Sequence, residues 1–308
     1  MGKIAFIFPG QGAQYAGMGK DFYENSSAAK EMFDLAAEVT GLDIPALCFT
    51  ENEQLNITEY TQIAMLATEV AILAEVKANH IHADICAGLS LGEYAALIAA
   101  EVLTPAEGFR IIRKRGIFMQ KAVPSGGAMS AVIGMDGDVI AKICEQTKGM
   151  VSVANYNCPG QIVITGEEAA VVTAAEGLKQ AGARRIIPLN VSGPFHSKML
   201  LAAGDQLAEV LENAEIGDIK IPYITNVTAD YVTDKEQVKG LLAQQISESV
   251  RWQQSIERML ADGVDTFVEI GPGKTLNGFL KKINREAVGV SIATIEDLKA
   301  VREGGKLC

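Results

Sequence analysis

Ser90 lies at the centre of the pentapeptide Gly-Leu-Ser-Leu-Gly, residues 88–92. The run before it, residues 85–87, is apolar like a strand, and residues 93–100 after it are composed like a helix. A serine between a strand and a helix, flanked by glycines, is typical of a nucleophile elbow. The tight turn exposes the hydroxyl group, and the first N–H groups of the helix point at the carbonyl under attack. The pattern therefore predicts acyl-transfer chemistry at Ser90, with a plain glycine-rich turn as the alternative.

A serine at neutral pH needs a base to accept its proton, and the chain has three histidines. His80 and His82 precede the elbow on its own incoming strand, so we expect them to point away from the serine. His196 follows Ser90 in the chain, as the base of an α/β-hydrolase follows its nucleophile. We therefore predict that His196 is the general base.

An acid to complete a catalytic triad is not evident between Ser90 and His196. The carboxylates there fall on predicted helices or inside a predicted insert, and none follows a strand of the main sheet. We expect a Ser–His dyad in which a backbone carbonyl or amide holds Nδ1 of the histidine. Without a carboxylate to stabilise the imidazolium, water is activated less well, so transfer is favoured over hydrolysis.

The elements that must position these residues alternate between strand and helix, which predicts an α/β fold with a mostly parallel sheet and helices on both faces. The predicted strands of this sheet are residues 3–8, 83–87, 221–226 and 266–270. The predicted helices are residues 26–40, 61–77, 93–100, 104–122, 199–213 and 235–250.

The pattern changes after the Pro-Ser-Gly-Gly segment 124–127. The order βαββαβ that follows is that of a ferredoxin-like split unit. Its predicted strands are 128–135, 151–155, 161–165 and 185–191, and its predicted helices are 138–146 and 167–181. We therefore expect a discontinuous catalytic domain, residues 1–124 and 192–308, and an inserted small subdomain, residues 125–191.

The composition, 48% hydrophobic and 21% charged residues in 308, is that of a soluble globular enzyme. A net charge of −11 argues against nucleic-acid binding, which depends on Lys and Arg. We see no signal segment and no run of membrane-spanning length, so we expect a cytoplasmic protein. The five scattered cysteines suggest reduced thiols without a disulfide framework or metal spacing.

An acidic partner would have to dock on a local basic patch, against the field of the net charge. For most of the basic residues a solvated helix face is the simpler interpretation. The candidate patches are Arg110, Arg113, Lys114, Arg115 and Lys121; Lys281, Lys282 and Arg285; and Arg184 with Arg185.

Three further motifs resemble cofactor or metal sites, but each lacks a residue that such a site needs. Residues 10–12 begin like a dinucleotide fingerprint, yet Tyr15 occupies the third glycine position. The Gly-Lys-Thr segment 273–275 resembles the end of a P-loop, yet Val268 stands where its first glycine belongs. The His-x-His-x-Asp segment 80–84 has no further ligand nearby and suits a solvated loop better than a metal site. We expect no metal and no cofactor.

A series of short motifs runs from the first predicted strand to the C-terminal part of the chain. They are FPGQGAQ at 8–14, GLSLGEY at 88–94, RG at 115–116 before MQ at 119–120, NYNCPGQ at 155–161, GPFHS at 193–197, VRW at 250–252 and EIGPG at 269–273. Through them the chain resembles the malonyl-CoA:acyl carrier protein transacylase family over essentially its whole length. The resemblance implies an α/β-hydrolase-like domain with a ferredoxin-like insert, in agreement with the pattern of elements.

The resemblance also implies roles for individual residues. Ser90 would be the nucleophile and His196 the base, and the backbone N–H groups of Gln11 and Leu91 would form the oxyanion hole. Arg115 would bind the free carboxylate of a malonyl group through two parallel charge-assisted hydrogen bonds.

Four more residues take supporting roles by the same resemblance. Gln245 corresponds to the residue that orients the histidine, while Asn155 and Gln62 line the cleft. Phe195 crowds the α-carbon of the acyl group, which favours malonyl over α-methyl substrates.

The implied reaction is ping-pong and uses no cofactor. Ser90 would take a malonyl group from malonyl-CoA, release coenzyme A, and pass the group to the phosphopantetheine thiol of acyl carrier protein for fatty-acid biosynthesis. We expect a monomer without nucleic-acid or membrane partners. Because the carrier protein of this family is acidic, one of the basic patches would form its dock.

Two positions depart from the family pattern. Leu89 stands where many members have a histidine, and we expect activity to survive because that position is commonly apolar in the others. Ile63 replaces a frequent proline after Gln62, for which we expect a small change in a loop. Two other functions stay open: an acyl hydrolase, opposed by Arg115 and the missing acid, and a scaffold that only binds carrier protein, opposed by the intact site residues.

Overall fold

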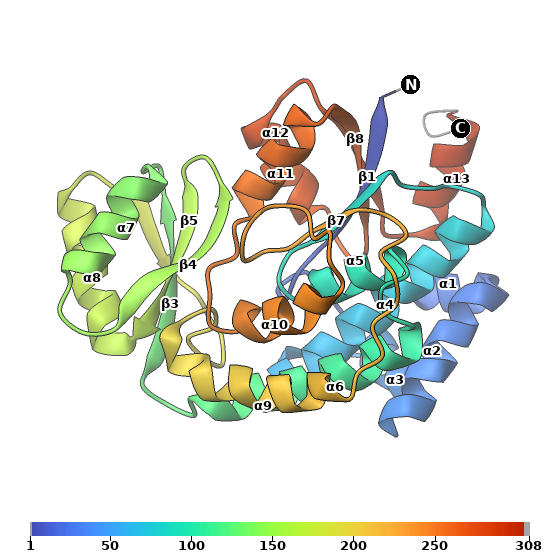
Figure 1. Ribbon diagram of the computed structural model, residues 1–308, viewed down its shortest axis with the longest axis horizontal. Coiled ribbons are helices and arrows are strands. Elements are labelled where there is room, and N and C mark those ends of the chain that lie inside the picture. The colour runs from blue at the N-terminus through green and yellow to red at the C-terminus, as the bar shows by residue number, and fades with distance from the viewer. Residues whose placement is uncertain (1, 305–308) are drawn as a thin grey trace.

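The computed structural model describes residues 2–304, in which two sheets lie side by side (Figure 1). The larger sheet has the strand order β7-β2-β1-β8-β9, and all of its strands run parallel. Its strands are β1 (Lys3–Phe8), β2 (Ile85–Gly88), β7 (Tyr223–Ile224), β8 (Val264–Ile270) and β9 (Val288–Ile292). The predicted parallel α/β sheet is confirmed, with β9 as an additional edge strand.

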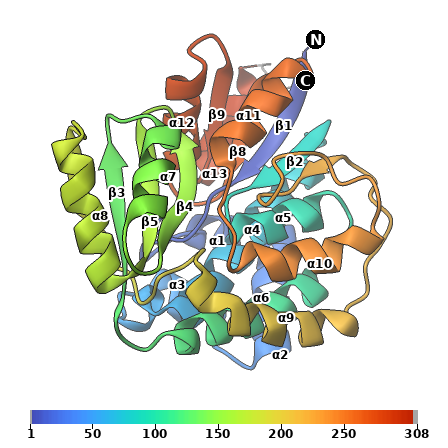
Figure 2. The same cartoon turned by 60° about the vertical axis from the view of Figure 1, so that its left-hand side comes forward.

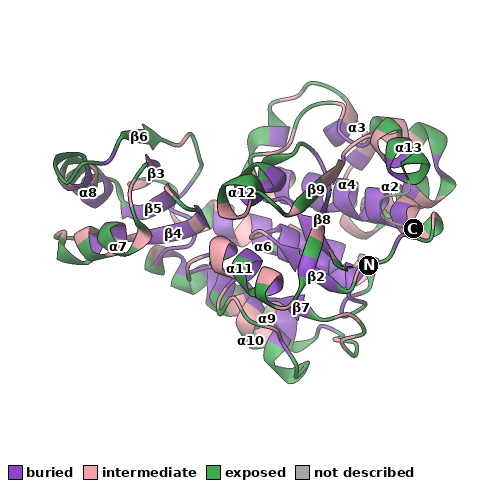
Figure 3. Ribbon diagram, turned by 90° about the horizontal axis from the view of Figure 1, so that it is seen from above, coloured by how far each residue is buried: buried purple, intermediate pink, exposed green. Residues whose placement is uncertain are grey.

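Helices cover both faces of this sheet because successive side chains of a strand point to opposite sides. Phe6 and Phe8 pack with the helices that precede the small sheet, whereas Ala5 and Ile7 pack with those near the C-terminus. The helices outside the small sheet are α1 (Lys20–Asn25), α2 (Ser27–Thr40), α3 (Ile44–Phe49), α4 (Thr58–Ala78), α5 (Gly92–Ala99), α6 (Pro105–Ala122), α9 (Leu201–Glu212), α10 (Glu236–Gln245), α11 (Trp252–Ala261), α12 (Thr275–Ile283) and α13 (Ile295–Glu303), with short 3₁₀ turns η1 (Gln54–Asn56) and η2 (Lys198–Leu200). Figure 3 shows the buried residues gathered in the central strands and in α4.

The smaller sheet is antiparallel, with the order β4-β5-β3-β6. Its chain order, β3 (Gly127–Ile133), α7 (Gly137–Gln146), β4 (Val151–Cys158), β5 (Gln161–Glu167), α8 (Glu168–Gln180) and β6 (Arg185–Pro188), confirms the βαββαβ prediction. One face packs on α7 and α8 through residues such as Val132 and Ile164. The other face, with Met129 and Val163, joins the core of the larger unit, beside which the small sheet stands (Figure 2).

Several predicted boundaries were wrong, and one of them matters for the site. The helix predicted over 235–250 ends at Gln245, because the backbone of Val250 bonds to β4 instead, with Tyr156 N–H donating to its carbonyl at 2.9 Å. Ile63 lies inside α4 and not in a loop, so the expected loop change does not apply. The helices α1, α3, α11, α12 and α13 were not predicted from the sequence.

Four of the five cysteines lie among the described residues. Cys48, Cys86, Cys144 and Cys158 are free and buried, and Cys308 lies outside the described residues. Burial raises the pKa of Cys48 and of Cys86 to about 12, so both stay protonated thiols. Within residues 2–304 no helix is both long and apolar enough to span a bilayer.

Candidate active site

Ser90 occupies the turn between β2 and α5 in a strained backbone conformation. Its φ is 56°, in the left-handed region that residues other than glycine rarely adopt. Asn226, which follows β7, holds the turn: its Oδ1 accepts from Ser90 N–H at 2.6 Å and its Nδ2 donates to the Gly88 carbonyl at 2.7 Å. Asn226 was not predicted from the sequence. The available signal was that β7 and β2 are parallel neighbours, whose carboxyl ends meet at one edge.

Glycine is required at positions 88 and 92 because backbone atoms lie too close to admit a Cβ; φ is not positive at either position. A Cβ at Gly88 would lie 2.0 Å from the backbone of Gly92, and one at Gly92 would lie 2.3 Å from the Phe8 carbonyl oxygen. The elbow is therefore pressed against the end of β1, which brings Ser90 next to the loop that carries Gln11.

Replacing Gly92 with alanine is expected to lower the free energy of unfolding by about 1 to 3 kcal/mol, because backbone atoms must move to admit the methyl group. Urea denaturation measures this change. Gly240 is the matched control: it lies exposed in α10, and a Cβ there would meet nothing within 4 Å, so Gly240→Ala should leave stability unchanged or raise it by up to about 1 kcal/mol. Equal stability of the two variants would contradict the close-packed elbow.

His196 contacts the serine with one ring nitrogen and a helix end with the other. Its Nε2 lies 2.8 Å from Ser90 Oγ, and its Nδ1 lies 2.8 Å from the Gln245 carbonyl oxygen and 3.2 Å from that of Glu248. Because carbonyls only accept, Nδ1 carries the hydrogen and Nε2 is left to receive the serine proton. The Gln245 carbonyl is available because α10 ends at this residue, and the last carbonyls of a helix lack intrahelical partners.

The electrostatics of the site keep His196 neutral at pH 7. Burial, and then the nearby charge of Arg115, lower the pKa of His196 to about 4. An uncharged imidazole is the form that can accept a proton from Ser90. The two other histidines, His80 and His82, are exposed on the turn before β2.

Arg115, from α6, lies wholly buried beside Ser90. Its Nη1 donates to Gln62 Oε1 at 2.8 Å, and its Nη2 donates to Gln245 Oε1 at 3.0 Å and to Ser90 Oγ at 3.1 Å. Among residues 2–304 no carboxylate forms an ion pair with it. Burial lowers the pKa of the Arg115 guanidinium. A buried positive charge costs free energy unless an opposite charge lies nearby. This site is suited to an anionic group held next to Ser90.

Two backbone N–H groups beside Ser90 have no hydrogen-bond partner in the described part of the chain. They belong to Gln11, after β1, and to Leu91, at the start of α5. Both residues line the cavity that contains Ser90. Their positions match those of an oxyanion hole, with one donor after the nucleophile and one on the loop after the first strand.

A cavity of about 510 Å³ lies over Ser90 between the two sheets. It brings together the predicted residues Gln11, Gln62, Ser90, Leu91, Arg115, Asn155, Phe195 and His196. Gln245 does not line the cavity; it lies behind Arg115 and His196 and contacts both. Apart from Asn155, the wall from the small sheet, which includes Met129, Asn157 and Val163, was not predicted from the sequence.

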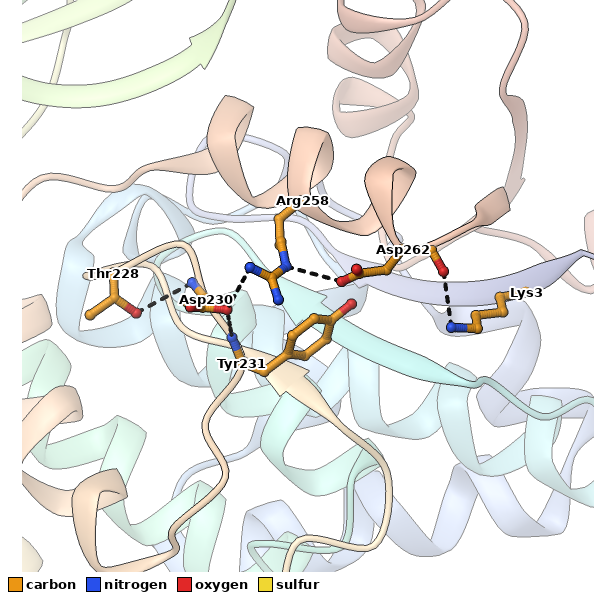
Figure 4. Close-up of polar contacts among 6 residues, drawn as sticks. All are labelled: Lys3, Thr228, Asp230, Tyr231, Arg258 and Asp262. Carbon is orange, nitrogen blue, oxygen red and sulfur yellow. Dashed lines mark hydrogen bonds and ion pairs between the residues drawn. The ribbon is translucent and has the colours of Figure 1, made fainter.

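A separate polar network anchors the segment that carries Asn226. Arg258 of α11 lies between Asp230 at 3.3 Å and Asp262 at 3.0 Å (Figure 4), while the carbonyl of Asp262 accepts from Lys3 Nζ. The Arg258 guanidinium also stacks over the Tyr231 ring. These ion pairs are exposed, so each contributes little to stability; the pair with Asp230 and the contact with Tyr231 connect the loop after β7 to α11.

The basic patches differ in their surroundings. Arg115 belongs to the cavity, Arg110 pairs with Glu107, and Arg113 pairs with Glu59 at 2.9 Å. The remaining candidates are exposed; they are Lys114, Lys121, Arg184, Arg185, Lys281, Lys282 and Arg285. No group of residues in the described range has the composition and geometry of a metal site.

A serine on a strained strand-to-helix turn, bonded to a neutral histidine and facing two free N–H groups, defines a serine acyl-transfer enzyme on an α/β-hydrolase-like scaffold. The chain belongs to the acyl transferase domain family, whose members it matches over residues 5–299. It is an acyltransferase.

Characterised relatives and solved structures agree with this assignment. The chain is 45% identical over 304 residues to the malonyl CoA-acyl carrier protein transacylase of Bacillus subtilis (strain 168), covering 97% of this chain and 96% of that protein. The crystal structure of the malonyl CoA-acyl carrier protein transacylase of Clostridium perfringens superposes with a TM-score of 0.95 at 40% identity, over 99% of this chain and 97% of that one. A malonyl-transacylase in complex with its type II PKS acyl-carrier protein superposes with a TM-score of 0.95 at 37% identity, over 98% and 99%.

Proposed function

We propose that this chain transfers a malonyl group from malonyl-CoA to the phosphopantetheine thiol of an acyl carrier protein, in supply of fatty-acid biosynthesis. The observation that carries the proposal is Arg115, a buried guanidinium without an ion-pair partner among residues 2–304, 3.1 Å from the nucleophilic oxygen. A guanidinium there binds the one group that distinguishes malonyl from neutral acyl chains, its free carboxylate. The relatives named above support the same substrate pair.

In the first half-reaction, Ser90 Oγ attacks the thioester carbonyl while its proton passes to His196 Nε2. The N–H groups of Gln11 and Leu91 hold the oxyanion of the tetrahedral intermediate. Collapse of the intermediate breaks the carbon–sulfur bond, and His196 returns the proton to the sulfur of coenzyme A. A malonyl ester on Ser90 remains, with its carboxylate on Arg115.

In the second half-reaction the phosphopantetheine thiol loses its proton to His196 Nε2 and attacks the malonyl ester. The carbon–oxygen bond breaks, and His196 protonates Ser90 Oγ. The helix end that supplies carbonyls to Nδ1 stabilises the transient imidazolium at both stages. No metal or cofactor takes part in either step.

Residues around the acyl group set its selection and the docking of the carrier protein. Phe195 borders the cavity and crowds the α-carbon, while Asn155 and Gln62 line the channel for the pantetheine arm and the acyl group. The basic residues Lys281 and Lys282 lie in the last turn of α12, whose first turn lines the cavity, so we place the dock for an acidic carrier protein there. We propose a cytoplasmic monomer with a catalytic domain of residues 1–124 and 192–308 and a subdomain of residues 125–191.

Incubation with malonyl-CoA followed by mass spectrometry tests this function against the two alternatives. A stable malonyl adduct on Ser90 that a carrier-protein thiol discharges is the expected result. Rapid release of free malonate would instead indicate a hydrolase, and the absence of any adduct would indicate a scaffold. The Ser90→Ala chain is the control for the site of attachment.

A further inference from the structure

Glu93, the second residue of α5, places a wholly buried carboxylate behind the nucleophile. Its Oε2 accepts from Gln245 Nε2 at 2.7 Å and from the Asn226 N–H at 3.0 Å, whereas its Oε1 has no partner within residues 2–304. A buried carboxylate is costly unless an opposite charge compensates it. The mechanism above gives Glu93 no part.

The side chain of Gln245 connects this carboxylate to Arg115. Its Nε2 donates to Glu93, and its Oε1 accepts from Arg115 Nη2 at 3.0 Å. Two buried groups of opposite charge, one on α5 and one on α6, thus lie at the two ends of a single amide from α10. Within residues 2–304 neither group forms an ion pair, either with the other or with a further side chain.

We infer that Glu93 is the counter-charge of Arg115 in the empty site, and that it takes up a proton when the carboxylate of an acyl group binds Arg115. Glu93 then acts as a positioning and specificity-determining residue that never touches the substrate. The inference rests on the proposed function, because it requires an acyl group that carries a carboxylate.

Charge balance in the buried site is the physical reason. Arg115 and Glu93 neutralise each other while the site is empty, but a bound carboxylate leaves two negative groups around one guanidinium. Protonation of Glu93 restores neutrality. The burial of Glu93 raises its pKa to about 7, so this proton is available near neutral pH.

The other titratable groups that face Glu93 do not change charge in this range. Burial raises the pKa of Tyr94, on α5, and of Tyr223, on β7, well above neutrality. His196, which contacts the Gln245 carbonyl, has a pKa lowered to about 4. A bound carboxylate weakens the effect of Arg115 on the pKa values of both His196 and Glu93. Of the two, only Glu93 has a pKa close to neutrality in the empty site.

The sign of the pH dependence follows from the same charges. The Arg115 charge lowers the pKa of Glu93, so a ligand that neutralises Arg115 raises it. A proton is then bound together with the ligand, and affinity for malonyl-CoA should fall by up to about tenfold per pH unit above pH 7. Acetyl-CoA lacks the carboxylate and should show no such fall.

Calorimetric titration of the Ser90→Ala chain, which cannot be acylated, measures the proton directly. Titrations at about pH 7.5 in buffers of different ionisation enthalpy give the protons taken up with malonyl-CoA and with acetyl-CoA. Subtracting the proton uptake for acetyl-CoA from that for malonyl-CoA removes the contribution of the phosphate groups of coenzyme A, which titrate near pH 6. In the Ser90→Ala chain we expect malonyl-CoA to bind with up to one more proton than acetyl-CoA. In the double variant that also carries Glu93→Gln we expect no difference between the two ligands. Glu69→Gln is the matched control, because Glu69 is an equally buried carboxyl on α4 without contact to Arg115, and it should leave the uptake unchanged.

The outcomes separate this inference from the function on which it rests. Equal affinity for malonyl-CoA and acetyl-CoA would overturn the proposed function. Preferential binding of malonyl-CoA without a difference in proton uptake would overturn the role of Glu93 alone, as would uptake that persists in Glu93→Gln. If Glu93→Gln does not fold, the pH dependence of malonyl-CoA affinity in Ser90→Ala decides, since a flat profile between about pH 6.5 and 8.5 contradicts the inference.

Discussion

Replacement of His196 with alanine will reduce the rate of Ser90 acylation by about 10²- to 10⁴-fold, the usual contribution of a positioned general base. Nothing else in the described site can accept the serine proton, because Arg115 is the only other side chain within hydrogen-bond distance of Ser90 Oγ and it is a donor. Single-turnover formation of the malonyl adduct, followed by mass spectrometry, measures the loss. The exposed His82 is the control, and His82→Ala should keep the full rate. Comparable rates for the two variants would remove His196 from the mechanism.

The lowered pKa of His196 adds a pH signature to the same prediction. A base works in its neutral form, and with a pKa of about 4 this form predominates from neutrality down to roughly pH 4. The rate of Ser90 modification by a neutral sulfonyl fluoride should therefore stay level across this range and fall only below it. An uncharged reagent avoids the titration of coenzyme A and brings no carboxylate to Arg115. A midpoint near 6.5, the ordinary value for histidine, would contradict the burial argument.

Replacement of Arg115 with alanine will reverse the preference between malonyl and acetyl groups. Loss of one partner from a buried, hydrogen-bonded charge pair costs about 2 to 5 kcal/mol, which is roughly a 30- to 4000-fold loss in malonyl loading. Acetyl loading makes no use of the guanidinium and should gain relative to malonyl. Competition between the two thioesters, read as the ratio of the adducts on Ser90, measures the change.

Lys114 offers a control one residue away on the same helix. It is exposed, so Lys114→Ala removes an equal charge without entering the cavity and should keep the malonyl preference. Circular dichroism of Arg115→Ala establishes that the fold survives before the ratio is interpreted. If malonyl stays the dominant adduct in that variant, Arg115 does not bind the carboxylate.

Local signals explain why much of the site was predictable. The elbow at Ser90 depends on residues next to it in the chain, and the nearby glycines that permit the turn are visible in the pattern itself. His196 follows by elimination, because the other histidines precede the elbow. The βαββαβ unit was clear because each of its elements has a strong period and is bounded by glycine or proline.

The missed elements have weaker local signals. β9 is half exposed and interrupted by Gly289, so it lacks the apolar run of a central strand. α12 follows Gly-Pro-Gly and a lysine, and its N-terminus is capped by Glu269, whose Oε1 accepts from the Leu276 N–H at 2.9 Å. A cap supplied from a preceding strand in this way has no fixed spacing that a sequence pattern could reveal.

The sequence by itself was enough to predict Ser90 as the nucleophile and His196 as its base, and to determine the type of fold and the order of most elements, because these depend on residue type and short spacings. Tertiary structure alone decided how the charges of the site are balanced. Glu93, Arg115 and Gln245 come from three helices, and Asn226 reaches Ser90 from a position 136 residues further along the chain. Hydrogen bonds between such distant residues depend on how the helices pack around the sheet, and burial sets the pKa values of Glu93 and His196 only once that packing excludes water.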